Sequence, residues 1–283
     1  MNSETVKACV QMTRPLNGAI VFLTITVAAL LAGASEGGWH FVLLGSMAGA
    51  LIAAGGNAIN DYFDVEIDKI NKPHRPLARG AIKPQGAWWT WRLLSSLGVI
   101  ISAYIGPYTF AIALFWVGTL YWYSKSLKRT VLWGNLTVAL ATGLALLYGG
   151  YTVGNVQSVF IPALFAFLVN LARELVKDSE DVAGDVQGNA MTMAVRHGVS
   201  ASLGTATAVL ALLIAATMVP YVEGVYNGSY LLLVSFTDLL LVYAIISMWR
   251  TRSPQNLARV SGTLKLSMVL GIAAIALGSY PWR

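Results

Sequence analysis

The sequence predicts an all-α, polytopic membrane protein, and its composition, its apolar stretches and the placement of its charges each support this. Of its 283 residues, 56% are hydrophobic and only 11% are charged, whereas soluble domains carry about 25% charged residues. The single cysteine, Cys9, excludes an intrachain disulfide. No segment has the composition of a soluble domain or a linker, so we expect one membrane-embedded domain over residues 1–283.

Nine apolar stretches are long enough to cross a bilayer. A crossing helix needs about 20 such residues, and backbone groups in lipid must bond internally, which favours helices. The N-terminal residues 3–14 are polar enough for a short amphipathic helix at the membrane surface. The nine predicted helices are residues 16–34, 39–58, 88–106, 108–124, 131–150, 156–174, 200–220, 229–249 and 262–280.

The basic residues predict an orientation in the cell membrane. With the N-terminus on the cytoplasmic side, all 19 Lys and Arg residues except Arg283 fall in cytoplasmic segments, as the positive-inside rule requires. The C-terminus is then outside. This bias accounts for the net charge of +6, so we expect membrane lipids rather than nucleic acid as partners.

Two acidic stretches share one pattern in a chain with few acids. DYFDVEID (61–68) and DSEDVAGD (178–185) both fit D-x-x-D-V-x-x-D. Each follows a predicted helix on the predicted cytoplasmic side, in a connection (about 59–87 and 175–199) longer than most. Long connections beside charged helix ends often cover a functional site.

If the preceding helices continue through these stretches, each presents its acids on one face. In the first, an arc of about 100° holds Asn57, Asn60, Asp61, Asp64 and Asp68, while Glu66 points away. In the second, Glu180 points away and an arc of about 60° holds Glu174, Asp178, Asp181 and Asp185. Gly184 is a point where the second helix could bend or end.

Such carboxylates repel one another unless a cation lies between them. Oxygen ligands without a histidine or cysteine cluster favour Mg²⁺ over zinc. Because Mg²⁺ usually binds a few carboxylates together with substrate phosphate oxygens, the two patterns indicate a metal-bound diphosphate. The alternative interpretation is a solvated, charged helix end.

Basic residues near both patterns fit an anionic substrate. Tyr121 and Lys125 are spaced to share one helix face, and Arg173 and Lys177 flank the second pattern. Such cations stabilise charge on a departing phosphate, although each could instead meet lipid headgroups. The connection after the first pattern contributes Lys69, Lys72, Arg75 and Arg79.

Four motifs together resemble the UbiA superfamily of intramembrane prenyltransferases. The first is Asn60-Asp61-x-x-Asp64-x-x-x-Asp68 followed by the sequence PHRP at 73–76, and the second is Asp178-x-x-Asp181-x-x-x-Asp185. The smaller motifs are Tyr121-x-x-x-Lys125 and Arg14-Pro15-x-Asn17. The resemblance extends over most of the chain.

This resemblance implies nine helices around a lipid-open cavity, in which Mg²⁺ holds an isoprenyl diphosphate. The allylic C–O bond would ionise and an acceptor would attack the prenyl group. The implied metal ligands are Asn60, Asp64, Asp68, Asp181 and Asp185. The implied catalytic residues are the four aspartates of that set with Lys125 and Tyr121. The implied substrate-binding residues are Asn57, Asn60, Asp61, Arg75, Asp178, Lys177, Arg14, Asn17 and Arg79.

Three segments resemble the digeranylgeranylglyceryl phosphate synthase branch of that family: NDYFDVEIDKINKPHRP, RELVKDSEDVAGD and GNLTVALATGLALLYGG. This likeness implies geranylgeranyl diphosphate as donor and a lipid-like acceptor, geranylgeranylglyceryl phosphate. The cations proposed for an anionic acceptor are Arg14, Arg79 and Lys83.

Three other membrane proteins fit part of the pattern. A prenyltransferase for aromatic, quinone or chlorophyll-type acceptors shares the motifs and differs in acceptor. A CDP-alcohol phosphotransferase also uses paired aspartates, but in a single run that this chain lacks. A cation transporter places acids near the bilayer midplane, and here only Asp238 is deep in a predicted helix.

Overall fold

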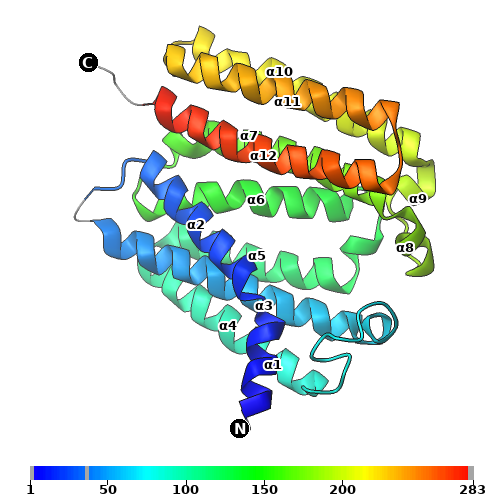
Figure 1. Ribbon diagram of the computed structural model, residues 1–283. Coiled ribbons are helices and arrows are strands. Elements are labelled where there is room, and N and C mark those ends of the chain that lie inside the picture. Colours follow the sequence, from blue (N-terminus) through cyan, green and yellow to red (C-terminus); the bar gives the residue numbers. More distant parts are fainter. Residues whose placement is uncertain (1–2, 36–37, 280–283) are drawn as a thin grey trace. The chain divides into compact units, whose positions relative to one another are not determined.

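The computed structural model describes residues 3–35 and 38–279, in which every regular element is a helix and no strand occurs (Figure 1). Each of the nine predicted stretches overlaps a helix in these residues. The short helices are α1 (Ser3–Thr13), α8 (Val182–Gln187) and α9 (Met193–His197), with 3-10 turns η2 (Leu127–Arg129) and η3 (Gln157–Val159). The long helices are α2 (Pro15–Leu31), α3 (Trp39–Asn71), α4 (Pro84–Ile105), α5 (Pro107–Lys125), α6 (Trp133–Thr152), α7 (Phe160–Glu180), α10 (Val199–Val222), α11 (Gly228–Arg250) and α12 (Pro254–Gly278).

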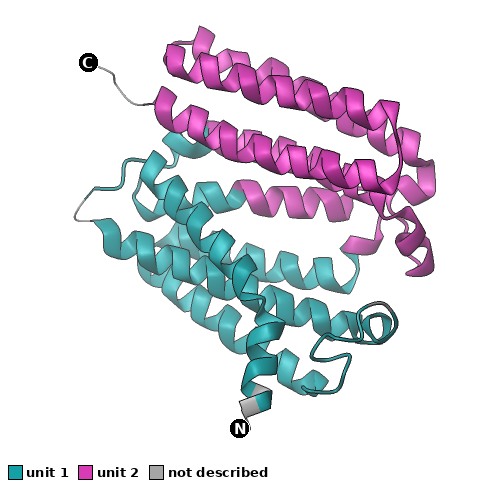
Figure 2. Cartoon of the chain, viewed as in Figure 1, with its two compact units in different colours: residues 1–127, 144–160 teal, residues 128–143, 161–283 magenta. Residues whose placement is uncertain are grey.

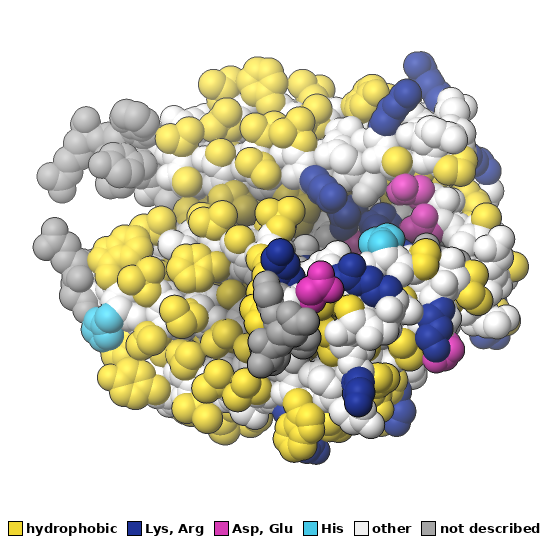
Figure 3. Space-filling view, turned by 60° about the horizontal axis from the view of Figure 1, so that its bottom comes forward, with side chains coloured by type: hydrophobic (Ala, Val, Ile, Leu, Met, Phe, Trp, Pro, Cys, Tyr) yellow, Lys and Arg dark blue, Asp and Glu magenta, His cyan; other side chains and the backbone are white. Residues whose placement is uncertain are grey.

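By length and composition, five of the described helices could cross a membrane: α3, α7 with the preceding η3, α10, α11 and α12. A sixth is the α1–α2 pair, which bends by 46°. The structure therefore supports several crossings, and nine stays a prediction. Figure 3 shows apolar side chains over much of the visible face, as expected where helices meet lipid. Arg283, predicted to lie outside, is beyond the described residues.

The chain divides into two compact units (Figure 2). Unit 1 holds residues 1–127 and 144–160, and unit 2 holds residues 128–143 and 161–283. One of the boundaries between them, at residues 143 and 144, lies within α6. The first acidic cluster, defined as Asp61, Asp64 and Asp68, belongs to unit 1. The second acidic cluster, Asp178, Asp181 and Asp185, belongs to unit 2. That both units form one domain stays a prediction.

In unit 1, α3 packs against α2, α4 and α5. Small residues bring α3 and α4 close together, because a Cβ on Gly98 would lie 2.9 Å from the Ala48 carbonyl oxygen and 2.6 Å from Ile52 Cγ1. Helix α1 buries Ala8 and Met12 beside Leu77. Its location at the membrane surface stays a prediction.

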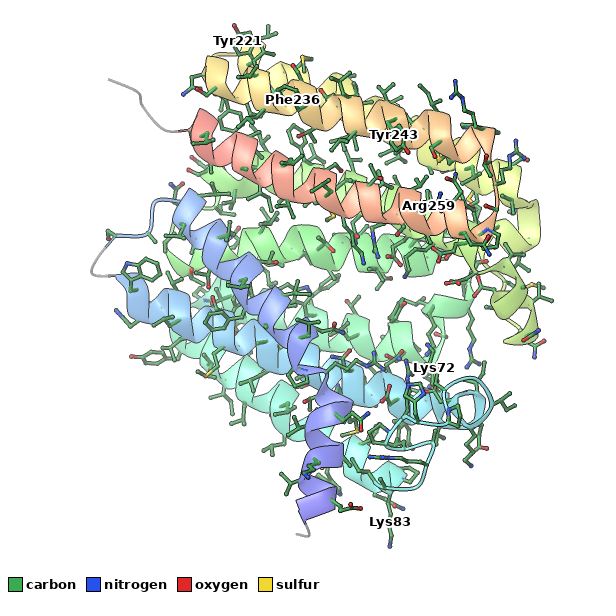
Figure 4. All side chains as sticks on the ribbon, viewed as in Figure 1. Lys72, Lys83, Tyr221, Phe236, Tyr243 and Arg259 are labelled. Carbon is green, nitrogen blue, oxygen red and sulfur yellow. The ribbon has the colours of Figure 1, made fainter. Side chains whose placement is uncertain are left out.

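Helix α3 continues to Asn71, so the first acidic cluster lies on a helix, as predicted. The connection to α4 therefore shortens to residues 72–83, with Lys72 and Lys83 at its two ends (Figure 4). Leu77 and Ile82 are buried in it, and these apolar contacts fix the connection against α1 and α3.

Unit 2 has a core of fully buried leucines from α7, α10, α11 and α12, including Leu175, Leu203, Leu241 and Leu264. Phe236 and Tyr243 lie on the exposed face of α11 (Figure 4). Asp238 is buried in α11, where its Oδ2 accepts a 3.0 Å hydrogen bond from the Thr217 hydroxyl.

Candidate active site

Two arginines hold the buried carboxylates of the first acidic cluster. Asp61 and Asp68 are 2% and 5% exposed. Arg75 Nη1 donates to both, to Asp68 Oδ2 at 2.5 Å and to Asp61 Oδ1 at 3.3 Å. Arg14 Nη2 donates to the same Asp61 oxygen. Arg14, just before α2, and Arg75, in the α3–α4 connection, form ion pairs with these acids. The ion pairs offset the cost of burying the two carboxylate charges.

Arg14 reaches α3 from a strained backbone. It precedes α2 with φ 50° and ψ 72°, a left-handed conformation that is uncommon outside glycine and costs about 1–3 kcal/mol. Asn57 contacts both residues at the junction between α1 and α2. Its Oδ1 accepts a hydrogen bond from Arg14 Nη1 (3.3 Å), and its Nδ2 donates one to the Thr13 carbonyl (3.0 Å). Arg14, Asn57, Asp61 and Arg75, each predicted to bind substrate, thus meet in one network.

Other predicted residues of unit 1 lie around this network. Asn60 Nδ2 donates to Asp64 Oδ2 at 3.2 Å, and Asp64 is half-buried. Arg79 instead donates to Gln11 on α1 (3.3 Å). Asn17 is exposed, with its backbone N–H bound to the Arg14 carbonyl (2.9 Å). Glu66 points away, as predicted.

Tyr121 and Lys125 share one face of α5. Lys125 Nζ lies 5.9 Å from the centre of the Tyr121 ring, within cation–π range. The Tyr121 ring also lies 5.5 Å from those of Trp91 and Phe63. Because Phe63 precedes Asp64 on α3, these aromatic contacts position Tyr121 beside the helix that carries the first acidic cluster.

The second acidic cluster is not on one continuous helix, contrary to the prediction. Helix α7 ends at Glu180, and Asp181 leaves helical geometry (φ −98°, ψ 11°) before α8 begins. The break lies before Gly184. The backbone N–H of Asp181 still bonds Lys177 and that of Asp185 bonds Asp181, both at 2.9 Å. The distortion is therefore local and leaves Asp181 exposed.

Two partners of the second acidic cluster were not among the predicted site residues. Asn135 on α6 donates to Asp178 Oδ2 (2.9 Å), and the Thr192 hydroxyl donates to Asp185 Oδ2 (3.0 Å). Burial raises the pKa of the Asp185 carboxyl, the Thr192 hydrogen bond opposes that shift, and the Asp181 charge adds to it. The sequence contains one signal for Asn135, which is an amide in a largely apolar helix. Buried amides need hydrogen-bond partners, so a polar contact at this position could have been predicted.

The basic residues beside the second acidic cluster pair with Glu174. Arg173 Nη1 lies 2.6 Å from Glu174 Oε1, and Lys177 Nζ lies 3.4 Å from Oε2. Lys177 keeps 39% of its side chain exposed. Its ammonium therefore remains accessible to an anion while Glu174 restrains it.

The family of this chain follows from a comparison with family models. The description "UbiA prenyltransferase family" matches residues 21–278. The chain belongs to the UbiA prenyltransferase family. Several helices are long and apolar enough to cross a membrane, and together with the family they identify the chain as a multi-pass membrane protein.

Named members of this UbiA family resemble the chain over nearly its full length. A digeranylgeranylglyceryl phosphate synthase of Thermococcus gammatolerans is 36% identical, covering 96% of this chain and 98% of the relative. One of Metallosphaera sedula is 39% identical over 86% and 85%. A solved structure described as a digeranylgeranylglyceryl phosphate synthase has a TM-score of 0.86 and 31% identity, covering 98% and 99%.

A UbiA homologue from Archaeoglobus fulgidus, solved with GPP and Mg²⁺, shares the fold at a TM-score of 0.69 and 16% identity, covering 95% of this chain and 99% of that one. In the present UbiA member, the donors of both clusters are oxygens, which suit a hard divalent cation. No three acidic, histidine or cysteine side chains converge as a metal site in the described residues. Mg²⁺ commonly takes only one or two protein carboxylates, so the residues fit it.

Proposed function

We propose that the protein transfers a geranylgeranyl group from geranylgeranyl diphosphate to geranylgeranylglyceryl phosphate, a step of ether-lipid synthesis. The observation that carries this proposal is the 36% identity to a named synthase over 96% of the chain. The acidic clusters and their arginines supply the charges that such a reaction needs.

The proposed reaction breaks the allylic C1–O bond of the donor, and its electron pair leaves with the diphosphate. The free hydroxyl oxygen of the acceptor then bonds to C1 and loses its proton. Lys125 and Arg75 would stabilise the departing diphosphate charge. The Tyr121 ring would face the positive charge on the prenyl group.

Mg²⁺ fits this chemistry as the counter-charge of the leaving diphosphate. In unit 1 the residues proposed as Mg²⁺ ligands are Asn60, Asp64 and Asp68. In unit 2 they are Asp181 and Asp185. Asp61 and Asp178 support them, the first through Arg14 and Arg75 and the second through Asn135.

The proposed topology is nine crossings with the N-terminus and both acidic clusters on the cytoplasmic side. The positive-inside distribution of Lys and Arg supports this orientation.

The test is prenyl transfer by the purified, detergent-solubilised full chain. Labelled geranylgeranyl diphosphate would be supplied with Mg²⁺ or with EDTA. Geranylgeranylglyceryl phosphate and 4-hydroxybenzoate would be offered as acceptors in parallel reactions. Mg²⁺-dependent product with the glyceryl phosphate alone is the expected result.

Each other outcome has a distinct meaning. Product with the aromatic acid alone would overturn the acceptor while keeping prenyl transfer. Product that persists in EDTA would overturn the metal requirement. Absence of product from either acceptor, with intact folding and diphosphate binding, would exclude both acceptors.

A further inference from the structure

A groove of about 720 Å³ lies between α4 and α5 within unit 1. Its lining includes neither the first acidic cluster nor Arg14 or Arg75, and it shares only Tyr121 with the residues proposed for prenyl transfer. One wall comes from α4, where Trp88, Trp91, Ser95 and Val99 line it, and the other from α5. The two helices are adjacent in sequence and pack against each other, so the groove belongs to one compact unit.

The groove changes character along its length. At one end, Trp88, Trp91 and Tyr121 form an aromatic wall beside Arg92. At the other end, the lining is aliphatic, with Ile100 and Leu114. Twelve helical residues separate Trp88 from Ile100, or about 18 Å. One leaflet of a bilayer core is about 15 Å thick, so the groove is as long as one lipid chain.

Its aliphatic end opens on an apolar surface. Ile100 and Leu114 are 64% and 48% exposed although they line the groove, and Leu97, about one turn before Ile100 on α4, is 42% exposed. In a multi-pass membrane protein such exposed aliphatic side chains face lipid tails. The groove is therefore accessible from the membrane.

The aromatic end carries a cation at the level expected for headgroups. The Arg92 guanidinium lies 5.2 Å and 5.3 Å from the ring centres of Trp88 and Trp89. Trp89 is 63% exposed. Exposed tryptophans and arginines mark the membrane–water interface, and the arginine attracts anionic headgroups.

Two buried donors lie between the cation and the aliphatic end. Trp91 Nε1 and Ser95 Oγ have no hydrogen-bond partner among the residues that the structure describes. Ser95 is only 4% exposed. Both donor atoms are fully buried, and Ser95 Oγ lies toward α3, 2.8 Å from a Cβ built on Gly55. They therefore lie beneath the groove surface, and lipid binding does not use them.

We propose that this groove binds one anionic phospholipid of the surrounding membrane, with its phosphate at Arg92 and one chain along the aliphatic end. Charge complementarity selects an anionic headgroup, and the graded lining selects an amphiphile rather than a soluble ligand.

Gly118 gives the proposal a precise test. It lines the groove, and a Cβ built on it meets no atom within 4 Å. The Cβ of a Gly118→Leu side chain would therefore enter the groove without a clash, and leucine is also a better helix former than glycine. Ser96→Leu offers a second block, because Ser96 is an exposed lining residue.

The experiment measures lipid retention by the detergent-purified full chain with native mass spectrometry. The probes are phosphatidylglycerol and phosphatidylcholine with identical chains. The wild type should retain one phosphatidylglycerol in preference to phosphatidylcholine. Gly118→Leu should weaken that binding by roughly tenfold or more, since two displaced methylenes suffice for such a loss. Arg92→Gln should reduce the preference for phosphatidylglycerol roughly fivefold.

Matched controls lie in unit 2. Gly271→Leu places the same side chain on α12, where a Cβ also meets nothing within 4 Å. Arg252→Gln removes another arginine stacked on a tryptophan, Trp249 at 4.8 Å. Both should retain wild-type binding and preference.

Two results would overturn the proposal. The first is equal retention of both lipids by the wild type. The second is unchanged retention by the folded Gly118→Leu and Ser96→Leu variants. If those variants also had a raised KM for isoprenyl diphosphate, the groove would be assigned to substrate instead. Neither result depends on the identity of the prenyl acceptor.

Discussion

Arg75 is the residue on which two buried carboxylates depend. Its Nη1 is within 3.3 Å of both Asp61 and Asp68. We predict that Arg75→Gln, measured without Mg²⁺, lowers the free energy of unfolding by about 2–4 kcal/mol, because the buried Asp68 loses its ion pair while Asp61 keeps only Arg14 among the described residues. Thermal unfolding in detergent, followed by tryptophan fluorescence, would show a drop of several degrees.

The matched control is Arg79→Gln in the same connection. Arg79 is exposed and contacts only the amide of Gln11 among the hydrogen bonds described for it. Its loss should change stability by less than about 0.5 kcal/mol. Equal effects of the two substitutions would show that the Arg75 ion pairs contribute little to the fold.

Asp64 and Asp181 are the residues at which the proposed metal role can be separated from folding. Asp64 is half-buried and Asp181 is exposed, so the isosteric changes Asp64→Asn and Asp181→Asn should leave the fold intact. Loss of a charged metal ligand should lower the rate of prenyl transfer by roughly 100-fold or more.

The controls are Glu66→Gln and Glu180→Gln. They change neighbouring acids that the helical pattern places away from the aspartate faces. Glu66 is 80% exposed and pairs with Lys69. Both controls should retain transfer within about twofold of the wild type, as expected of surface changes. Near-normal rates in both aspartate variants would contradict the metal assignment.

At the level of helices, the close contact between α3 and α4 depends on Gly98. Alanine there would gain about 1 kcal/mol of helix propensity. Its Cβ would, however, lie 2.9 Å from the backbone oxygen of Ala48, and overpacking of this kind costs about 1–3 kcal/mol. Because a backbone oxygen cannot rotate away, we predict that Gly98→Ala lowers the temperature of unfolding.

Gly204→Ala on α10 is the corresponding control, since a Cβ there meets nothing within 4 Å. It should be neutral or stabilising by up to about 1 kcal/mol. A Gly98→Ala variant as stable as Gly204→Ala would show that α3 and α4 can separate without cost.

The sequence predicted helices better than it predicted contacts between them. Apolar length located the helices, and the acidic periodicity extended α3 through Asp68. The break at Asp181 was not predicted, because α-helical hydrogen bonding continues on both sides of it. Asn135 and Asp178 are 43 residues apart, so their contact has no local signal. The left-handed backbone of Arg14 is likewise set by distant groups, Asn57 and Asp61.

At the scale of the whole chain, the number of membrane crossings decides which segments share a side. Between Lys83 and Ser158 the chain contains α4, α5 and α6. None of these is among the five helices that length and composition alone identify as spans. If only those five cross, Lys83 and Ser158 lie on the same side. If all nine long helices cross, three crossings separate them and they lie on opposite sides.

We therefore predict that Ser158→Cys, and not Lys83→Cys, reacts with a membrane-impermeant maleimide on intact cells. Both substitutions would be made in a Cys9→Ala background, which removes the only native cysteine. Both positions are exposed, so each should react after the membrane is permeabilised. Reaction of both, or of neither, on intact cells would rule out nine crossings. Reaction of Lys83→Cys alone would show that the orientation is the opposite of the predicted one. The basic residues of the α3–α4 connection would then lie outside, against the positive-inside rule.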